Sequence, residues 1–299
     1  MTIQLIGAFT ALITPFRHQE IDESALRSLV DFQISNGIHG LVPCGTTGES
    51  ATMTEDERRR VIEIVIDQTA GKVPVIAGTG SNDTRRSIEA TQHAQAVGAN
   101  AALVVVPYYN KPTQDGLIAH YTAIANSSEL PLVLYNVPGR TGISMSAETT
   151  LRLANLPSIV AIKEACGSLD QVSEIIAGAP RNFSVLSGDD SLTLPMMSVG
   201  AHGVISVVSN IVPGAISALA EAGLRGDFDA ARDIHFSLFD LMRAMFIENN
   251  PTAVKAAASM LGLCSDELRL PLVPMNPANR SRVVAALESC LYTRRPIAA

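Results

Sequence analysis

Short apolar runs alternate with amphipathic stretches along most of this chain, and the alternation restricts the possible folds more than any other feature. Each run is rich in Val, Ile and Leu, as is typical of strands that are covered on both faces. The stretches between the runs, such as residues 55–70 and 84–97, have the spacing of amphipathic helices. Strands that alternate with helices indicate parallel βαβ units. The predicted strands are residues 7–13, 39–43, 73–77, 101–106, 131–135, 159–163, 183–187 and 202–207.

Units of this kind can close into a (β/α)8 barrel or remain an open, doubly wound sheet. The number of units and their span of roughly 225 residues favour the barrel. An open sheet more often carries a G-x-G-x-x-G motif after its first strand. The nearest candidate, GTGSND at residues 78–83, lacks the third glycine. We therefore predict an α/β fold in which residues 1–226 form a (β/α)8 TIM barrel.

The strand pattern stops near residue 226, and the rest of the chain has the pattern of helices. We therefore predict a small C-terminal helical domain at residues 227–299. Its predicted helices are residues 227–247, 252–262 and 277–292.

Composition excludes several classes of function. The net charge of −7 argues against a nucleic-acid partner, since phosphate binding needs a basic face. No apolar run approaches the roughly 18–20 residues that a membrane span needs. The first residues lack the basic region and the cleavage site of a signal peptide. The cysteines (Cys44, Cys166, Cys264 and Cys290) lie far apart without C-x-x-C spacing, so we expect a cytoplasmic protein with reduced thiols.

No metal site is predicted, because the histidines show neither H-x-H nor H-E-x-x-H spacing. The Asp189–Asp190 pair could hold a cation, but we expect it to cap the helix that follows. Cys44 and Cys166 are expected to be small buried residues and not nucleophiles. Glu164 and Glu49 could orient neighbouring side chains, but the sequence leaves their roles open.

Chemically useful side chains gather where the predicted strands end, which is where a barrel enzyme has its active site. Lys163 stands out because it is the one lysine that directly follows an apolar strand. Such a lysine can simply reach the surface or pair with a buried carboxylate. Alternatively, an apolar barrel mouth lowers a lysine pKa, and the neutral amine can attack a carbonyl to form a Schiff base. The other strand-end motifs are GTTGES (45–50), PYYNKPTQ (107–114), NVPGRTG (136–142), SGDD (187–190) and GVISVVSN (203–210).

Three neighbouring features fit a Schiff-base site. Tyr135 ends the strand next to that of Lys163, so its hydroxyl is a reasonable proton shuttle. The glycines and hydroxyls of GTTGES suit an anion, although such a turn can equally precede any helix. Arg140 could hold a substrate carboxylate in bidentate fashion, although a single arginine is often only a surface charge.

Taken together, these motifs resemble the 4-hydroxy-tetrahydrodipicolinate synthase family, formerly called dihydrodipicolinate synthase. The motifs occur in the same order and spacing, and the resemblance extends to ELRLPLVP at residues 267–274. It implies that pyruvate forms a Schiff base on Lys163 without any other cofactor. The enamine would then attack L-aspartate 4-semialdehyde, in the first committed step toward diaminopimelate and lysine.

The resemblance also implies roles for single residues. Lys163 matches the Schiff-base lysine, Tyr135 the proton donor and acceptor, and Arg140 the group that holds the semialdehyde carboxylate. Thr46 and Tyr109 match the rest of a hydroxyl relay, and the family takes the residue matching Tyr109 from the neighbouring subunit. A homotetramer built from two tight dimers is therefore expected. Further substrate-binding positions match Thr47, Gly188 and Ile205.

Some family members are inhibited by free lysine, and this chain departs from their pattern. The matching effector positions are Ser50, Ala51, Asn82 and Tyr108. Glu55, Arg58 and Arg86 stand where regulated members carry His, His and Glu. Because Arg86 replaces an acid that would pair with the effector's ammonium group, we predict weak or absent inhibition by lysine.

Two other functions remain open at this point. Another pyruvate-dependent aldolase, acting on a sugar-derived aldehyde, is the nearest. Sialic-acid lyases, however, generally carry Ser at the position of Thr46 and lack an arginine at position 140. A non-catalytic barrel that senses a keto acid or lysine should have lost Lys163 or Tyr135, and this chain retains both.

Overall fold

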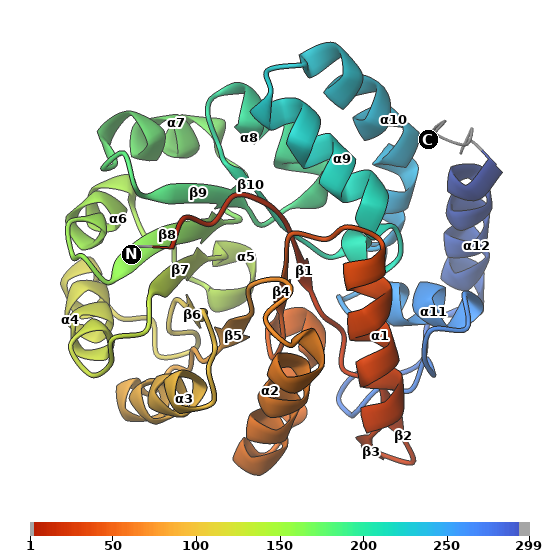
Figure 1. The fold of residues 1–299 in the computed structure, drawn as a ribbon, viewed down its shortest axis with the longest axis horizontal. Helices are drawn as coiled ribbons and strands as arrows, with labels where there is room; N and C mark the ends of the chain where they lie inside the picture. Colours follow the sequence, from red (N-terminus) through yellow and green to blue (C-terminus); the bar gives the residue numbers. More distant parts are fainter. Residues whose placement is uncertain (1–2, 293–299) are drawn as a thin grey trace.

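The computed structural model describes residues 3–292 and has a barrel of eight parallel strands at its centre (Figure 1). The strands follow the order β4-β1-β10-β9-β8-β7-β6-β5, and a parallel bridge between Leu41 and Val75 joins the two ends of the sheet. All eight predicted strands and the TIM barrel are thereby confirmed. The strands are β1 (Gly7–Ala11), β4 (Gly40–Val42), β5 (Ile76–Gly78), β6 (Ala101–Val105), β7 (Leu132–Asn136), β8 (Ile159–Glu164), β9 (Ser184–Ser187) and β10 (Gly203–Ser206).

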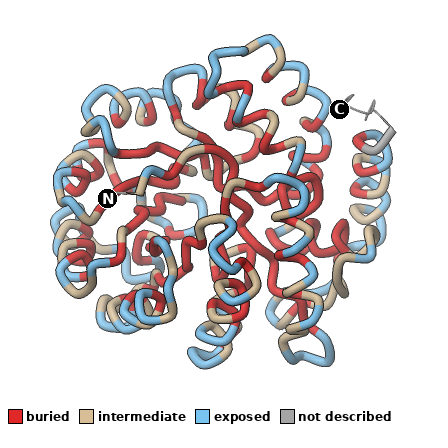
Figure 2. Tube along the Cα trace, in the orientation of Figure 1, coloured by how far each residue is buried: buried red, intermediate tan, exposed pale blue. Residues whose placement is uncertain are grey.

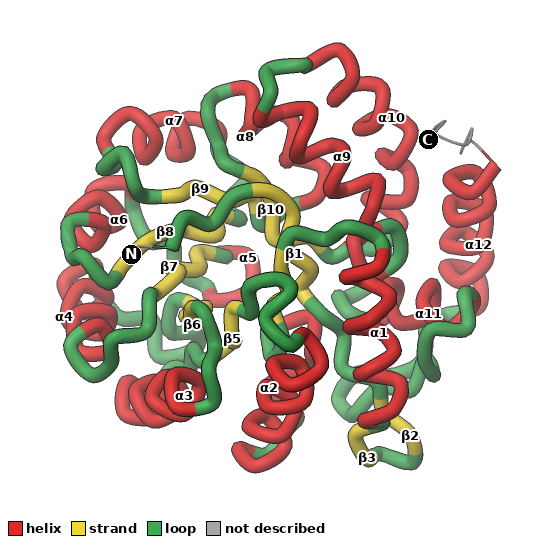
Figure 3. The backbone as a smooth tube through the Cα atoms, in the orientation of Figure 1, coloured by secondary structure: helices red, strands yellow, loops and turns green. Residues whose placement is uncertain are grey.

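Helices surround the strands, as Figure 3 shows. Local signals explain where they begin: α2 starts after Thr54, whose side chain forms a capping box with Glu57. The longer helices pack one face on the barrel; α2 buries Val61 and Val65 on this face. The barrel helices are α1 (Glu23–Ser35), α2 (Glu55–Thr69), α3 (Thr84–Ala96), α4 (Gln114–Ala125), α5 (Pro138–Thr141), α6 (Ala147–Ala154), α7 (Leu169–Gly178), α8 (Thr193–Ser198) and α9 (Pro213–Leu224).

The strands separate two apolar regions and are buried along their length (Figure 2). A small cluster that includes Tyr135 and Ile205 fills the barrel, and a larger one lies between strands and helices. Successive residues of a strand face opposite sides. Tyr135 therefore points into the barrel and its neighbour Asn136 points out. The same alternation turns Lys163 inward and Glu164 outward, since these residues are their register partners.

Three helices follow the barrel: α10 (Phe228–Ala244), α11 (Thr252–Met260) and α12 (Pro277–Tyr292). They confirm the predicted C-terminal helices: α10 packs against α9, and α12 packs against α10 and α11 (Figure 1). Their apolar side chains, such as Leu241 and Val283, belong to the same large core as the barrel helices. The boundary at residue 226 stays a prediction, and residues 293–299 of the predicted domain lie outside the described part. No helix within residues 3–292 is long and apolar enough to cross a membrane.

An antiparallel hairpin after β1 was not predicted. It consists of β2 (Phe16–Arg17) and β3 (Glu20–Ile21), which are too short for a periodic pattern. Phe16 is nevertheless fully buried, and it packs beneath two cationic side chains of the C-terminal segment.

Candidate active site

A cavity of about 250 Å³ opens at the carboxyl ends of the strands. It brings together side chains from the loops after β4, β6 and β7, which the sequence analysis treated as separate motifs. Among the predicted residues, its lining includes Thr46, Tyr135, Arg140, Ser50, Ala51 and Tyr108.

Lys163 lies beside this cavity at the end of β8. Its Nζ is 4.4 Å from the centre of the Tyr135 ring, and Tyr135 itself lines the cavity. The two residues are register partners on adjacent strands, so the backbone holds them together. Sequence reasoning predicted this pairing, and the geometry agrees with it.

The charges of Asp189 and Asp190 act on Lys163, but neither carboxylate lies within ion-pair distance of its amine. The residue is 5% exposed, yet it makes no hydrogen bond or ion pair within residues 3–292. An amine that no hydrogen bond or ion pair holds is available as a nucleophile at the barrel mouth. The alternative that Lys163 forms an ion pair with a buried carboxylate does not agree with this geometry.

The GTTGES loop forms two short 3-10 helices, η1 (Thr46–Gly48) and η2 (Ser50–Thr52). Thr46 lines the cavity, whereas Thr47 is buried and its Oγ1 accepts a hydrogen bond of 2.9 Å from Asn250 Nδ2. The backbone N–H groups of Thr46 and Thr47 make no hydrogen bond to the described residues. Free N–H groups and hydroxyls on one loop can bind a carboxylate.

The remaining predicted substrate positions surround the same region. Ile205 is buried in the barrel interior. A Cβ atom on Gly188 would lie 3.2 Å from Lys163 Cε and 2.7 Å from Ala165 Cβ, so a side chain there would press on the lysine. Arg140 is exposed on α5, which begins at Pro138, and it lines the cavity.

Asp189 and Asp190 do not act as predicted. Neither side chain caps the short helix η3 (Asp190–Leu192) that follows. Instead, Asp190 Oδ2 accepts hydrogen bonds from the backbone N–H groups of Val207 (3.1 Å) and Val208 (3.0 Å). The carboxylate thus caps η4 (Val208–Asn210) after β10, a contact that no local pattern reveals. Burial raises the pKa of Asp189, opposed by the nearby charges of Lys163 and Arg140.

Tyr109 is not brought to this site within one chain. It is 89% exposed, with a left-handed backbone (φ 70°), and it is absent from the cavity lining. Its neighbour Tyr108 lines the cavity in its place. A role for Tyr109 in catalysis therefore requires a second subunit.

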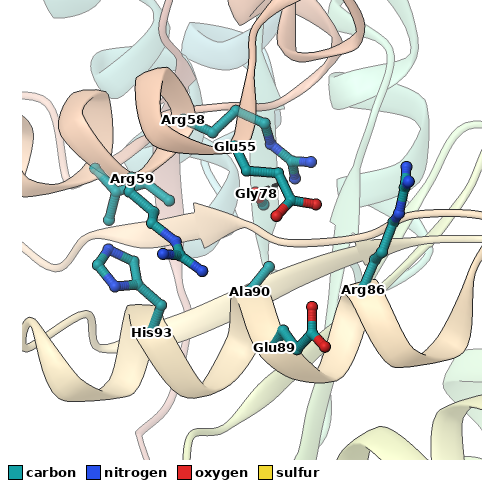
Figure 4. A pocket seen from close by; sticks show the side chains of 9 residues that line it. Glu55, Arg58, Arg59, Gly78, Arg86, Glu89, Ala90 and His93 are labelled. Atoms are coloured by element: carbon teal, nitrogen blue, oxygen red, sulfur yellow. Dashed lines mark hydrogen bonds between the residues drawn. The ribbon is translucent and has the colours of Figure 1, made fainter.

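The predicted effector residues divide between two places. Ser50, Ala51 and Tyr108 line the cavity, whereas Asn82 does not, and its carbonyl accepts a hydrogen bond from Asn110. A separate small pocket of about 30 Å³ lies between α2 and α3 (Figure 4). Its lining includes Glu55, Arg58 and Arg59 from α2 together with Arg86, Glu89 and His93 from α3. Arg58 lines both this small pocket and the larger cavity.

Glu164 has a structural role that the sequence left open. Its carboxylate is buried behind the barrel wall, and burial raises its pKa. It accepts hydrogen bonds from Asn136 Nδ2 (3.0 Å), Gln171 Nε2 (3.0 Å) and the backbone N–H of Cys166 (2.9 Å). These bonds join the ends of β7 and β8 and thereby support Tyr135 and Lys163.

Cys44 and Cys166 are predicted to resist alkylation in the native protein. Burial raises the pKa of each thiol to about 12, and at Cys166 the charge of Glu164 adds to the effect. The expectation of burial is correct for Cys44 but wrong for Cys166, which is partly exposed. Treatment with iodoacetamide at pH 8, followed by mass spectrometry, should show slow labelling of both until denaturant is added. Rapid labelling of either thiol in the folded protein would contradict this.

Sequence reasoning missed Asn250 and Lys255, and it left the role of Glu49 open. Lys255 falls within the predicted helix at residues 252–262, and it is fully buried and paired with Glu49. Asn250 belongs to a break between predicted helices. The sequence signal nearest to Asn250 and Lys255 is ELRLPLVP, which follows them along the chain and resembles a family motif.

The comparisons with known proteins all point to one enzyme family. The model of the dihydrodipicolinate synthetase family matches residues 4–290. A 4-hydroxy-tetrahydrodipicolinate synthase from Thermomicrobium roseum is 55% identical over 289 residues, covering 97% of this chain and 96% of the relative. The crystal structure of dihydrodipicolinate synthase from Aquifex aeolicus superposes with a TM-score of 0.94 at 48% identity, covering 95% and 97% of the two chains. A monomeric dihydrodipicolinate synthase variant is similar too, with a TM-score of 0.94, 41% identity and coverage of 95% and 96%.

Proposed function

The chain belongs to the dihydrodipicolinate synthetase family, and from this we propose that it condenses pyruvate with L-aspartate 4-semialdehyde to give 4-hydroxy-tetrahydrodipicolinate. It is then a lyase of diaminopimelate and lysine biosynthesis. The observation that carries the proposal is the amine of Lys163, which lies 4.4 Å from the centre of the Tyr135 ring and has no hydrogen-bond partner among residues 3–292.

The reaction begins with attack of Lys163 Nζ on the C2 carbonyl of pyruvate. Loss of water leaves an iminium ion, which draws electrons from C3 and so allows C3 to lose a proton. The resulting enamine attacks the aldehyde carbon of the semialdehyde, and the aldehyde oxygen takes up a proton. The amino group of the product then attacks the imine carbon, closes the ring and releases the lysine.

The other cavity residues transfer protons and bind the substrate carboxylates. The Tyr135 hydroxyl transfers protons at the forming imine, and Thr46 lines the same cavity as a relay partner. Thr47 and the N–H groups of its loop hold the pyruvate carboxylate. Arg140, at the rim, suits the carboxylate of the semialdehyde because a guanidinium binds carboxylates in bidentate geometry.

The test is pyruvate consumption by purified protein, with and without L-aspartate 4-semialdehyde and without added metal. Consumption only in the presence of the semialdehyde supports the proposal. A protein that forms a borohydride-reducible pyruvate adduct but ignores the semialdehyde would be an aldolase with another acceptor. A protein that forms no adduct would leave the keto-acid chemistry without support.

The proposal includes a homo-oligomer in which Tyr109 completes the site of a neighbouring subunit. The 89% exposure of Tyr109 supports this, since a tyrosine so exposed is free to be covered by another copy. A tetramer of two tight dimers is the proposed assembly. Because one similar protein is a monomeric variant, the assembly needs its own measurement, for example by analytical ultracentrifugation.

Subunit mixing tests the shared site directly. Tyr109→Phe and Lys163→Ala subunits should each be nearly inactive alone, while mixed dimers contain one site with both native residues. Dissociation and reassembly of an equimolar mixture should therefore restore about a quarter of wild-type activity, if both sites act independently. No activity above that of the parents would contradict the shared site.

Free lysine is predicted to inhibit weakly or not at all. The pocket between α2 and α3 contains three arginines and two glutamates, so its charges do not favour an ammonium group. Initial rates should stay unchanged at submillimolar L-lysine. Arg86→Glu, which restores an acidic group, is the matched variant and should bind lysine more tightly. Strong inhibition of the wild type would overturn the prediction.

We also propose that the protein acts in the cytoplasm and needs no cofactor beyond the covalent Schiff base. Cys44, Cys166 and Cys264 are unpaired thiols, which suits a reducing compartment. No group of three metal-ligating side chains converges within the described residues. Full activity after dialysis against a chelator, and activity in the cytosolic fraction, would support both points.

A further inference from the structure

The segment after α10 reaches back across the chain and holds the GTTGES loop. Asn250 donates to Thr47, Lys255 pairs with Glu49, and the backbone N–H of Arg269 donates to the same glutamate. Arg269 also donates to the carbonyl of Thr52 at 3.2 Å. The loop that carries Thr46 and Thr47 is thus anchored by residues about 200 positions away.

The strongest of these anchors is the ion pair between Lys255 and Glu49. Lys255 Nζ lies 2.5 Å from Glu49 Oε1, and both side chains are fully buried. The ammonium group also donates to the carbonyl of Glu267 at 2.7 Å and lies 4.2 Å from the centre of the Phe16 ring. Because both charged groups have their hydrogen-bond partners, this buried pair holds the GTTGES loop and α11 in one arrangement.

In the hydrogen bond between Asn250 and Thr47, the amide is the donor and the hydroxyl oxygen is the acceptor. The Asn250 amide donates to Thr47 Oγ1 at 2.9 Å, and Asn250 is only 7% exposed. A hydroxyl carries a single proton, so one that accepts at its oxygen keeps that proton for another acceptor. Asn250 Oδ1 has no partner among the described residues, so the amide does not hold the loop through a second bond.

We propose that Asn250 is a positioning residue that directs the Thr47 hydroxyl proton toward the substrate carboxylate. The inference rests on the proposed function, in which Thr47 holds the pyruvate carboxylate. Asn250 itself does not contact the reacting atoms; it acts through Thr47.

The test compares the half-saturating pyruvate concentration for borohydride trapping in several variants. Asn250→Ala frees the Thr47 hydroxyl to rotate and should raise this concentration about tenfold, the effect of losing one well-directed hydrogen bond. Asn250→Asp should raise it further, because a carboxylate only accepts and would draw the Thr47 proton to itself. KM for the semialdehyde should change little in either variant.

A double-mutant cycle distinguishes orientation of the Thr47 hydroxyl from a change in the structure of the whole GTTGES loop. In a Thr47→Val background, which has no hydroxyl to orient, Asn250→Ala should add less than a twofold change. Asn279→Ala is the matched control, since Asn279 lies in the same C-terminal segment and donates to Glu248, away from the loop. It should leave pyruvate saturation unchanged.

The outcomes distinguish this inference from the proposed function. If the wild type forms no pyruvate adduct, the proposed function fails. If the wild type is trapped but Asn250→Ala saturates like the wild type, the positioning role is wrong. An equal effect of Asn250→Ala with and without the Thr47 hydroxyl would also overturn it, because Asn250 would then act on the loop as a whole.

Discussion

A Lys163→Met variant is expected to fold normally and to lose at least about 10³-fold in kcat, since no other group can form the covalent intermediate. Methionine has nearly the length of lysine and suits a buried site, so the structure should tolerate it. Treatment with pyruvate and borohydride should add mass to the wild type and none to the variant. Circular dichroism and thermal unfolding check that the fold remains.

Lys72→Met provides the control for this experiment. Lys72 is exposed in the turn after α2, and its loss should affect neither turnover nor trapping. If Lys163→Met were still trapped by borohydride, the Schiff base would form on another lysine and the assignment of Lys163 would be wrong.

The second large effect is expected at Lys255, in stability. Lys255→Met removes the ammonium group that is ion-paired with buried Glu49, and breaking a buried pair in this way costs about 3–5 kcal/mol. The free energy of unfolding, measured with urea, should fall by that amount. In the Glu49→Gln/Lys255→Met double variant no charge is left unpaired, so most of the loss should be recovered.

An exposed ion pair supplies the matched control. Arg232 and Asp229 form an i,i+3 pair on the surface of α10, and Arg232→Met should change stability by no more than about 0.5 kcal/mol. A loss below about 1 kcal/mol for Lys255→Met would mean that water reaches Glu49, and the pair would then not anchor the loop.

The two buried lysines have opposite roles because their surroundings differ. Lys255 has a carboxylate, a carbonyl and an aromatic ring around its ammonium group. Lys163 has the Tyr135 ring but no hydrogen-bond partner among residues 3–292. Complete pairing stabilises a charge and makes it unreactive, whereas an unpaired amine beside a cavity is available for chemistry.

Much of the fold was predictable from the sequence because its signals are local. Strands such as residues 101–106 appear as apolar runs, and α2 shows both its helical spacing and its cap within a few residues. The register of parallel strands then places Tyr135 beside Lys163. The hairpin at Phe16 escaped detection because two-residue strands carry no period.

What the sequence by itself determined about this protein is the barrel, the positions of its strands, the lysine at the end of β8 and the family to which the motifs belong. Only the tertiary structure decided that Lys255 is buried against Glu49, that Asn250 donates to Thr47 and that Asp190 caps a different loop from its own. The physical reason is the separation along the chain: 206 residues separate Lys255 from Glu49, and 203 separate Asn250 from Thr47. Helical and strand periods act over a few residues, so contacts of that range exist only once the barrel has closed and the C-terminal helices have packed against it.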